Sequence, residues 1–381
     1  MTPGPLGAIG RFMATHRLAV VAVWVLVAAG LGVFAPKLEH ALSGAMWEVE
    51  GSDSLAAREV IEREFGGLSS QSAVIVLQSE TLTYEDPAFA ERIAAANAVL
   101  ANEQAFGPAV PPQPSQDGKT VMLQAGAVVD PTEAVRAAGR IADDVGALGD
   151  DQVLVALTGS PAFWNDFNEV NREGMMKAEM LTWPITLVIL VIAFGSLAAA
   201  GLPLMLTAAG LISAMGVLYG VTQFTDLSIW TLNFAIMFAL ALGIDYALFI
   251  VSRYRGAIHA TPEDPKFAVA VTMDTSGKAV LFSGLTVLIS LSAILLVPIP
   301  AFRSMAAGMM LAVAFVLLAA LTLLPAVIGP WINRLSLPGI RRASTAARGG
   351  RRSPGGCNRG RACSLSARRW CCCSSPRRCS T

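Results

Sequence analysis

The sequence predicts an α-helical membrane bundle of six spans, with an α+β domain inserted between the first and second spans. Three observations support this fold class. Hydrophobic residues make up 54% of the 381 residues and charged residues only 15%, whereas soluble domains carry about 25% charged residues. Six apolar stretches are long enough to cross a bilayer, which takes about 20 residues. Between the first two stretches lies a long acidic segment in which strand and helix signals alternate.

The six apolar stretches are expected at residues 18–34, 181–197, 200–221, 229–252, 279–299 and 303–330. Arg11 and Arg17 precede the first stretch and predict a cytoplasmic N-terminus by the positive-inside rule. This stretch lacks a small-x-small cleavage site, which favours an uncleaved anchor over a signal peptide. Threading six spans from there puts residues 37–180 outside and residues 253–278 inside. We therefore expect a multi-pass protein of the cell inner (plasma) membrane.

The segment 37–180 is expected to fold as an external α+β domain. It holds 23 Asp and Glu residues against 9 Lys and Arg residues, a net charge of −14, which favours a solvated acidic surface over a cation-binding one. Asp86 and Asp130, each followed by proline, are the expected N-caps of two helices, and Glu133 takes the N3 place of a capping box. Strand signals lie at residues 71–78, 119–129 and 152–158. The order βα…βαβ favours a split βαβ, ferredoxin-like subdomain.

Asp245 and Tyr246 lie inside the fourth apolar stretch and are the first candidates for function. At 1.5 Å per residue, Asp245 lies roughly 10 Å deep from the cytoplasmic end. A carboxylate there costs about 2.5 kcal/mol or more to insert, so it indicates proton chemistry in the membrane. The alternative is that Asp245 only ties helices together by a hydrogen bond.

Three smaller residues are supporting candidates near this pair. Gly243 has no side chain and is expected to let a neighbouring helix approach closely. Ser283 and Thr286 share a face of the fifth stretch and would lie within reach of the aspartate if that face points toward it. Hydroxyl residues in membrane helices more often pack or bond their own backbone, and that interpretation is favoured here.

Several functional classes find no support in the sequence. Intramembrane aspartyl proteases need two facing carboxylates, and the predicted spans contain a single Asp. Patterns for Ser-His catalysis, HExxH metal binding and phosphate loops are missing. The three histidines, His16, His40 and His259, all lie outside the spans, which argues against an intramembrane metal site. We therefore expect no enzymatic activity, no cofactor, no metal and no nucleic-acid partner.

The arrangement of one span, a large external domain and five clustered spans resembles the N-terminal half of a resistance–nodulation–division (RND) transporter. Within that superfamily, GIDYALFIVSRYR (243–255) is similar to the fourth-span signature of the mycobacterial membrane protein large (MmpL) family. Three other segments resemble the family's second-to-third-span passage, fifth-span entry and sixth-span end: 179–204, 275–289 and 321–329. The resemblance covers about residues 1–340.

This resemblance implies export of lipids or lipid-like molecules driven by the proton-motive force, with Asp245 and Tyr246 at the positions of the family's proton-relay pair. In the family, this pair faces a matching pair in a second half, which this sequence lacks. We therefore expect a split or truncated half-transporter that is inactive alone. Its expected partners are membrane lipids, a lipid-like substrate and a separately encoded second half. The alternative is a non-transporting scaffold or sensor with a sterol-sensing-like bundle.

The last 41 residues differ from everything before them. Residues 341–381 hold 11 Arg, no acidic residue and all six cysteines of the chain. A zinc module is disfavoured because no C-x-x-C pair occurs. We interpret the segment as translation in a shifted reading frame, with a lipidated or lipid-binding tract as the alternative, and expect disorder in either case. The predicted divisions of the chain are thus residues 1–36, 37–180, 181–340 and 341–381.

Overall fold

The computed structural model describes residues 4–334, except residues 45, 48, 50, 66, 67, 69, 70, 196 and 263. The segment 341–381, with its expected disorder, lies outside the described residues. Among the described residues, six helices are long and apolar enough to cross a membrane, and each overlaps one predicted stretch. They span Arg17–Leu38, Ser160–Phe194, Ala199–Val221, Trp230–Ala260, Pro265–Leu296 and Pro300–Gly329.

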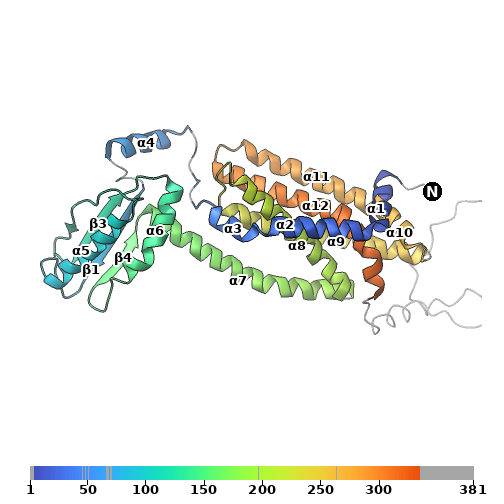
Figure 1. Cartoon of the computed structure of the whole chain (residues 1–381), viewed down its shortest axis with the longest axis horizontal. Coiled ribbons are helices and arrows are strands. Elements are labelled where there is room, and N and C mark those ends of the chain that lie inside the picture. The colour runs from blue at the N-terminus through green and yellow to red at the C-terminus, as the bar shows by residue number, and fades with distance from the viewer. Residues whose placement is uncertain are drawn as a thin grey trace, which may run out of the picture. The chain divides into compact units, whose positions relative to one another are not determined.

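The helices of the bundle are α1 (Pro5–Thr15), α2 (Arg17–Gly32), α3 (Ala35–Ala41), α7 (Ser160–Phe194), α8 (Leu197–Val221), α9 (Trp230–Ala260), α10 (Pro265–Thr272), α11 (Lys278–Ser292) and α12 (Pro300–Arg334) (Figure 1). A π-helical turn, Met273–Gly277, joins α10 to α11, and a 3-10 turn, Ala293–Leu296, follows α11. The fifth span, Pro265–Leu296, is therefore a composite of four helical segments.

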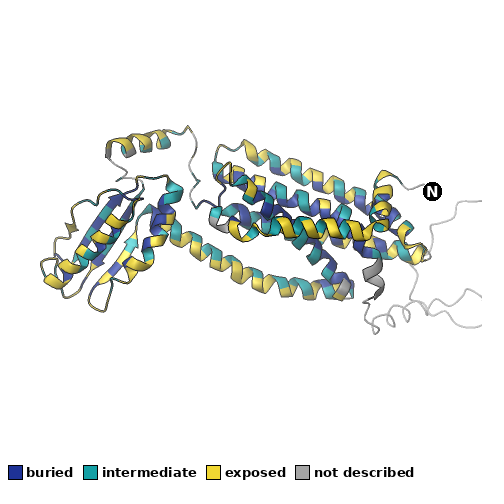
Figure 2. Cartoon of the chain, viewed as in Figure 1, coloured by how far each residue is buried: buried dark blue, intermediate teal, exposed yellow. Residues whose placement is uncertain are grey.

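Helix α12 forms the centre of the bundle and α2 its rim. About 67% of the apolar part of α12 is buried, whereas α2 buries no residue (Figure 2). Small side chains such as Ala312, Ala319 and Ala320 line the buried face of α12 and let α8 and α9 pack closely against it. Leu18 and Leu26 of α2 are largely exposed, as expected of a membrane helix at the edge of a bundle.

Helix α7 is continuous through the boundary predicted at residue 180. It begins in the α+β part of the chain, contains Pro184 without ending there, and terminates at Gly195. Gly195 adopts a left-handed conformation (φ 63°), which glycine accepts at no steric cost, and its N–H bonds to the carbonyl of Val191. A single helix, rather than a flexible linker, thus connects the α+β part to the second membrane span.

The α+β part contains a four-stranded antiparallel sheet with the order β2-β3-β1-β4. Three strands match the predicted ones: β1 (Ser72–Gln78), β3 (Thr120–Gly126) and β4 (Leu154–Thr158). The short β2 (Gln113–Pro114) lies in a proline-rich segment that also contains Pro108, Pro111 and Pro112, outside the three strand signals of the sequence. The sequence did not predict it because its two residues carry no alternating apolar pattern.

Two helices cover one face of this sheet, α5 (Pro87–Asn102) and α6 (Pro131–Gly146), while α4 (Asp53–Phe65) precedes β1. The inward side chains of β1 and β3 alternate with outward ones, as a half-buried strand requires. Ile75 and Leu123 are fully buried against Phe89 of α5 and Ile141 of α6. This apolar layer is the core of the α+β part.

Of the two predicted N-cap aspartates, one caps its helix with its side chain and the other does not. Asp130 accepts hydrogen bonds from the amides of Thr132 and Glu133, as expected of an N-cap. Asp86 occupies the N-cap position of α5, but its carboxylate accepts from Thr83 instead of from the helix. The capping box is also incomplete, because the Glu133 side chain pairs with Arg140 rather than with the N-cap amide.

Carboxylates in the α+β part are held by arginines. Arg140 donates to Glu103 at 3.0 Å and to Glu133 at 2.9 Å, and Arg92 pairs with Asp150 at 2.7 Å. The hydrogen bond from Arg140 lowers the pKa of Glu103 below its ordinary value. Backbone amides of Val153 and Gln152, followed by Arg92, lower the pKa of Asp150 in the same way. The net negative charge is thus partly organised into stabilising contacts.

Candidate functional site

Asp245 and Tyr246 lie in the middle of α9 and face α11. They line a cavity of about 270 Å³ together with Leu242, Phe249, Ala279, Val280 and Ser283. The Tyr246 side chain is buried, whereas Asp245 is exposed at the surface of this bundle. Because α9 is a membrane-spanning helix, a carboxylate exposed at its middle would be costly against lipid and is better placed facing protein or water.

Neither polar group of this pair has a strong partner in the described part of the chain. Asp245 forms no ion pair or hydrogen bond there. The hydroxyl of Tyr246 is buried and lies near the Ser283 side chain, but the two do not meet the geometric criteria of a hydrogen bond. Buried polar atoms without partners are uncommon and ask for an explanation, which includes groups that act only in another state of the protein.

Gly243 lies on the side of α9 that packs against α8, away from Asp245. A Cβ atom at this position would lie only 2.1 Å from Oγ1 of Thr207 on α8, so only glycine fits. Helix α8 therefore approaches α9 closely at Gly243. Gly243 and Asp245 are two residues apart, about 200° around the helix. Helix α9 is therefore packed tightly against α8 on one side and carries the carboxylate on the other.

The two hydroxyl candidates of α11 behave differently. Ser283 lines the cavity beside Asp245 and Tyr246. Thr286 donates a hydrogen bond to the carbonyl of Phe282 at 2.9 Å and does not line that cavity. The favoured interpretation, bonding to the helix backbone, thus holds for Thr286, while the geometry brings Ser283 to the pair.

A larger cavity of about 810 Å³ lies between α7 and α9. Glu179 and Asn171 of α7 line it, and Glu179 Oε1 and Asn171 Nδ2 are buried without a hydrogen-bond partner in the described chain. The rest of the lining is mostly apolar and includes Met237, Leu240 and Ile244 of α9. The cavity therefore offers an apolar groove with one unpaired acceptor and one unpaired donor.

No metal centre accompanies these cavities. Within the residues that the structure describes, no three His, Cys, Asp or Glu side chains come together as ligands for an ion.

The profile of the MMPL family matches residues 46–370, which is more than half of the chain and includes α9 with Asp245. The chain belongs to the MMPL family. The match extends past residue 340, where the sequence resemblance was expected to end, and so includes part of the Arg/Cys-rich segment.

Three relatives of the chain carry different functional names. The mycolic acid-containing lipids exporter MmpL11 of Mycolicibacterium smegmatis is 33% identical over 82% of this chain and 33% of its own length. The heme uptake protein MmpL11 of Mycobacterium tuberculosis H37Rv is 32% identical over 84% of this chain and 34% of its own length. The trehalose monomycolate exporter MmpL3 of Mycobacterium tuberculosis CDC 1551 is 26% identical over 87% of this chain and 36% of its own length. The chain thus spans about a third of the length of these relatives.

Sequence reasoning found most polar groups around α9 of this MMPL-family chain but missed Thr207. Its side chain is fully buried, and its hydroxyl has no hydrogen-bond partner in the described chain. The available signal was a hydroxyl residue four positions after Pro203, within an otherwise apolar and small-residue run. That signal is weak, because only the packing of α8 on α9 shows that Thr207 contacts Gly243.

Proposed function

We propose that this chain forms the proton-relay half of an exporter of lipids or lipid-like molecules that is driven by the proton-motive force. Membership of the MMPL family and similarity to two relatives named as lipid exporters support lipid transport. The observation that carries the proposal is the pair Asp245 and Tyr246, which shares a cavity with Ser283 on the side of α9 away from α8.

In this proposal Asp245 binds and releases protons, and the buried Tyr246 hydroxyl stabilises a carboxylate opposite it. A protonated Asp245 is neutral and an ionised one is charged, so the proton changes the cost of exposing the residue to an apolar surface. Such a change biases two packings of the bundle by the difference in their free energies. Ser283 contributes a hydroxyl to the same cavity.

We further propose that a second half-bundle, on the same or another polypeptide, covers the exposed side of Asp245. The exposure of this carboxylate in the middle of a membrane-spanning helix supports such a cover. The relatives are about three times as long as the matched region, which leaves them room for it. Transport is then a property of the completed bundle.

The α+β part is proposed to be an external, ferredoxin-like porter domain. The strand order β2-β3-β1-β4 with two helices on one face supports this assignment. Because α7 is continuous from residue 160 to residue 194, a tilt of the second span would be transmitted to the domain. The proton step and the substrate path are coupled by this helix in the proposal.

The direct test is lipid-dependent proton flux in proteoliposomes that contain the chain with a second half-bundle. Asp245→Asn should abolish the flux, whereas Asp226→Asn, which removes an exposed loop carboxylate, should leave it unchanged. Separate experiments with a trehalose-linked lipid and with heme distinguish the two substrate classes for which relatives are named. Equal flux for Asp245→Asn and the unchanged chain would refute the proposal.

A second candidate function is a non-transporting membrane sensor with a sterol-sensing-like bundle. The 810 Å³ cavity between α7 and α9 favours it, because an apolar groove with an unpaired carboxylate and amide suits a small amphiphile. A sensor would bind a hydroxylated amphiphile in this groove and lose binding with Glu179→Gln and Asn171→Leu. Binding that persists in Asp245→Asn, with no proton flux under any condition, would favour the sensor over the exporter.

A further inference from the structure

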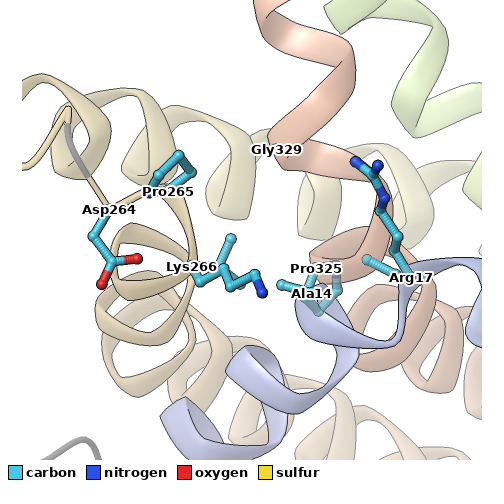
Figure 3. Close-up of a pocket in the computed structure, with 9 residues that line it drawn as sticks. Ala14, Arg17, Asp264, Pro265, Lys266, Pro325 and Gly329 are labelled. Atoms are coloured by element: carbon cyan, nitrogen blue, oxygen red, sulfur yellow. The ribbon is translucent and has the colours of Figure 1, made fainter.

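A third cavity lies at the end of the bundle where α1 meets α2, α10 begins and α12 approaches its end. Its volume is about 420 Å³. Two cations line it, Arg17 and Lys266. In Figure 3 the Lys266 ammonium points toward Ala14 and Pro325, whereas the Arg17 guanidinium lies farther along the cavity, toward Gly329. The remaining lining consists of Ala14, Asp264, Pro265, Val269, Pro325, Ala326 and Gly329.

Within the described residues, no salt bridge neutralises the two cations of this cavity. Neither Arg17 nor Lys266 forms an ion pair within the described residues. Asp264 is the single acid in the lining, and its carboxylate accepts the N–H of Phe267 at 3.0 Å as the N-cap of α10. In Figure 3, Asp264 lies on the side of Lys266 that is remote from Arg17. An anion in this cavity would be attracted by both positive charges without displacing a salt bridge within the described residues.

The wall that α1 contributes is fixed in place. The amides of Gly4 and Gly7 donate to the two carboxylate oxygens of Asp274, at 2.5 and 2.9 Å. A Cβ atom at Gly7 would lie 2.8 Å from the carbonyl oxygen of Ala270, so α1 packs on α10 through glycine. The cavity is therefore formed before any ligand arrives, which lowers the entropic cost of binding.

The surroundings of Arg17 indicate where a lipid would extend. Arg17 is the first residue of α2, and α2 buries none of its residues. Leu18, the next residue, is 79% exposed. A phosphate held by Arg17 and Lys266 would thus lie at the point where the lipid-facing surface of α2 begins. Acyl chains can follow that surface, which a free phosphate cannot exploit.

We propose that this cavity binds the phosphate of an anionic phospholipid, with the apolar floor under its glycerol and the acyl chains along α2. By the positive-inside rule the lipid comes from the cytoplasmic leaflet. Basic pockets between helices at this depth bind anionic headgroups through the same electrostatic attraction. The site goes beyond the proposed export function, because lipid binding here involves neither Asp245 nor a proton gradient.

Native mass spectrometry of the full chain in detergent tests the site, with short-chain phosphatidylglycerol and phosphatidylcholine as probes. Arg17→Gln and Lys266→Gln should each weaken phosphatidylglycerol binding about fivefold, and the double variant about 25-fold. The matched control is Arg11→Gln, which removes a cation of α1 that does not line the cavity. Gly329→Val is a second variant: it fills the floor without changing charge, since a Cβ there meets only Tyr254 Oη at 3.7 Å.

The proposal is supported if phosphatidylglycerol binds more tightly than phosphatidylcholine and both cation variants and Gly329→Val weaken it while Arg11→Gln does not. It is overturned if Arg11→Gln weakens binding as much as Arg17→Gln, which would indicate only a general surface potential. It is also overturned if inorganic phosphate alone displaces the lipid completely, because the site would then be one for free phosphate. None of these outcomes depends on whether the chain transports anything.

Discussion

Carboxylates in the α+β part have hydrogen-bond partners, whereas two carboxylates in the membrane bundle lack them within the described residues. In the α+β part, Glu103 and Asp150 accept hydrogen bonds from arginines or backbone amides. In the bundle, Asp245 forms no ion pair or hydrogen bond within the described chain, and one oxygen of Glu179 is buried without a partner. A paired carboxylate stabilises the fold, whereas an unpaired one in an apolar setting costs stability. The presence or absence of a partner therefore distinguishes carboxylates that stabilise the fold from those that are candidates for function.

The largest change in stability is expected at the contact between α8 and α9, the helix that carries the unpaired Asp245. Gly243→Ala places a Cβ atom 2.1 Å from Thr207 Oγ1 and should destabilise the bundle by about 1–3 kcal/mol through overpacking. The matched control is Gly256→Ala on the same helix, where a Cβ meets nothing within 4 Å and helix propensity improves. Thermal unfolding in detergent measures both.

The same contact offers a rescue. Thr207→Ala removes the hydroxyl that clashes with the new methyl group, so it should recover part of the stability lost in Gly243→Ala. If the double variant is no more stable than Gly243→Ala, the α8–α9 contact described by Gly243 and Thr207 is not the source of the loss.

A smaller effect is expected where a carboxylate caps a helix in the α+β part. Asp130→Ala removes the acceptor for two amides of α6 and should cost about 0.5–2 kcal/mol. Asp130→Asn keeps an acceptor at the N-cap and should stay close to the unchanged protein. Urea unfolding followed by the circular dichroism of the chain measures the difference, and an equal loss for both variants would assign the effect to charge rather than to capping.

The smallest expected stability effect, and one that depends on pH, involves Glu103. Its side chain is 16% exposed and that of Arg140 is 49% exposed, so solvent screens the pair and its contribution should stay below about 1 kcal/mol. Arg140 lowers the pKa of Glu103 in the folded state. A depressed carboxyl pKa contributes stability above the unfolded-state value, near 4.3, and that contribution is lost as the pH falls through the folded value. Glu103→Gln should therefore lower the unfolding temperature at pH 7 and matter less in strong acid, and equal losses at both pH values would contradict this account.

Much of this contrast was readable from the sequence. The length of the apolar stretches predicted the spans. The aspartate inside one of them predicted the candidate site, because a charged side chain in a membrane span is costly and usually has a functional role. Proline after Asp130 predicted the start of α6. Three features depend on tertiary packing and could not be predicted: the contact between Thr207 and Gly243, the choice of Ser283 over Thr286, and the pairing of Glu133 with Arg140 in place of the capping box.

The continuity of α7 shows a different limit. Its polar N-terminal half and apolar C-terminal half look like two regions in the sequence, which placed a boundary at residue 180. Helical hydrogen bonding continues through such a change in polarity, since the backbone does not distinguish water from lipid as long as its own bonds are made. The result is a single helix from residue 160 to residue 194 that joins the α+β part to the second span.

Asp245→Asn tests the central claim most directly, by comparing export of a trehalose-linked lipid with thermal unfolding on the same preparations, in the presence of a second half-bundle. Because Asp245 has no ion pair within the described residues, its replacement should leave the unfolding temperature unchanged or raise it, while gradient-driven export is abolished. Glu103→Gln should show the reverse, with export kept and stability slightly reduced. Export by Asp245→Asn at the level of the unchanged chain, at equal amounts of folded protein, would contradict the assignment of Asp245 as the proton-binding group.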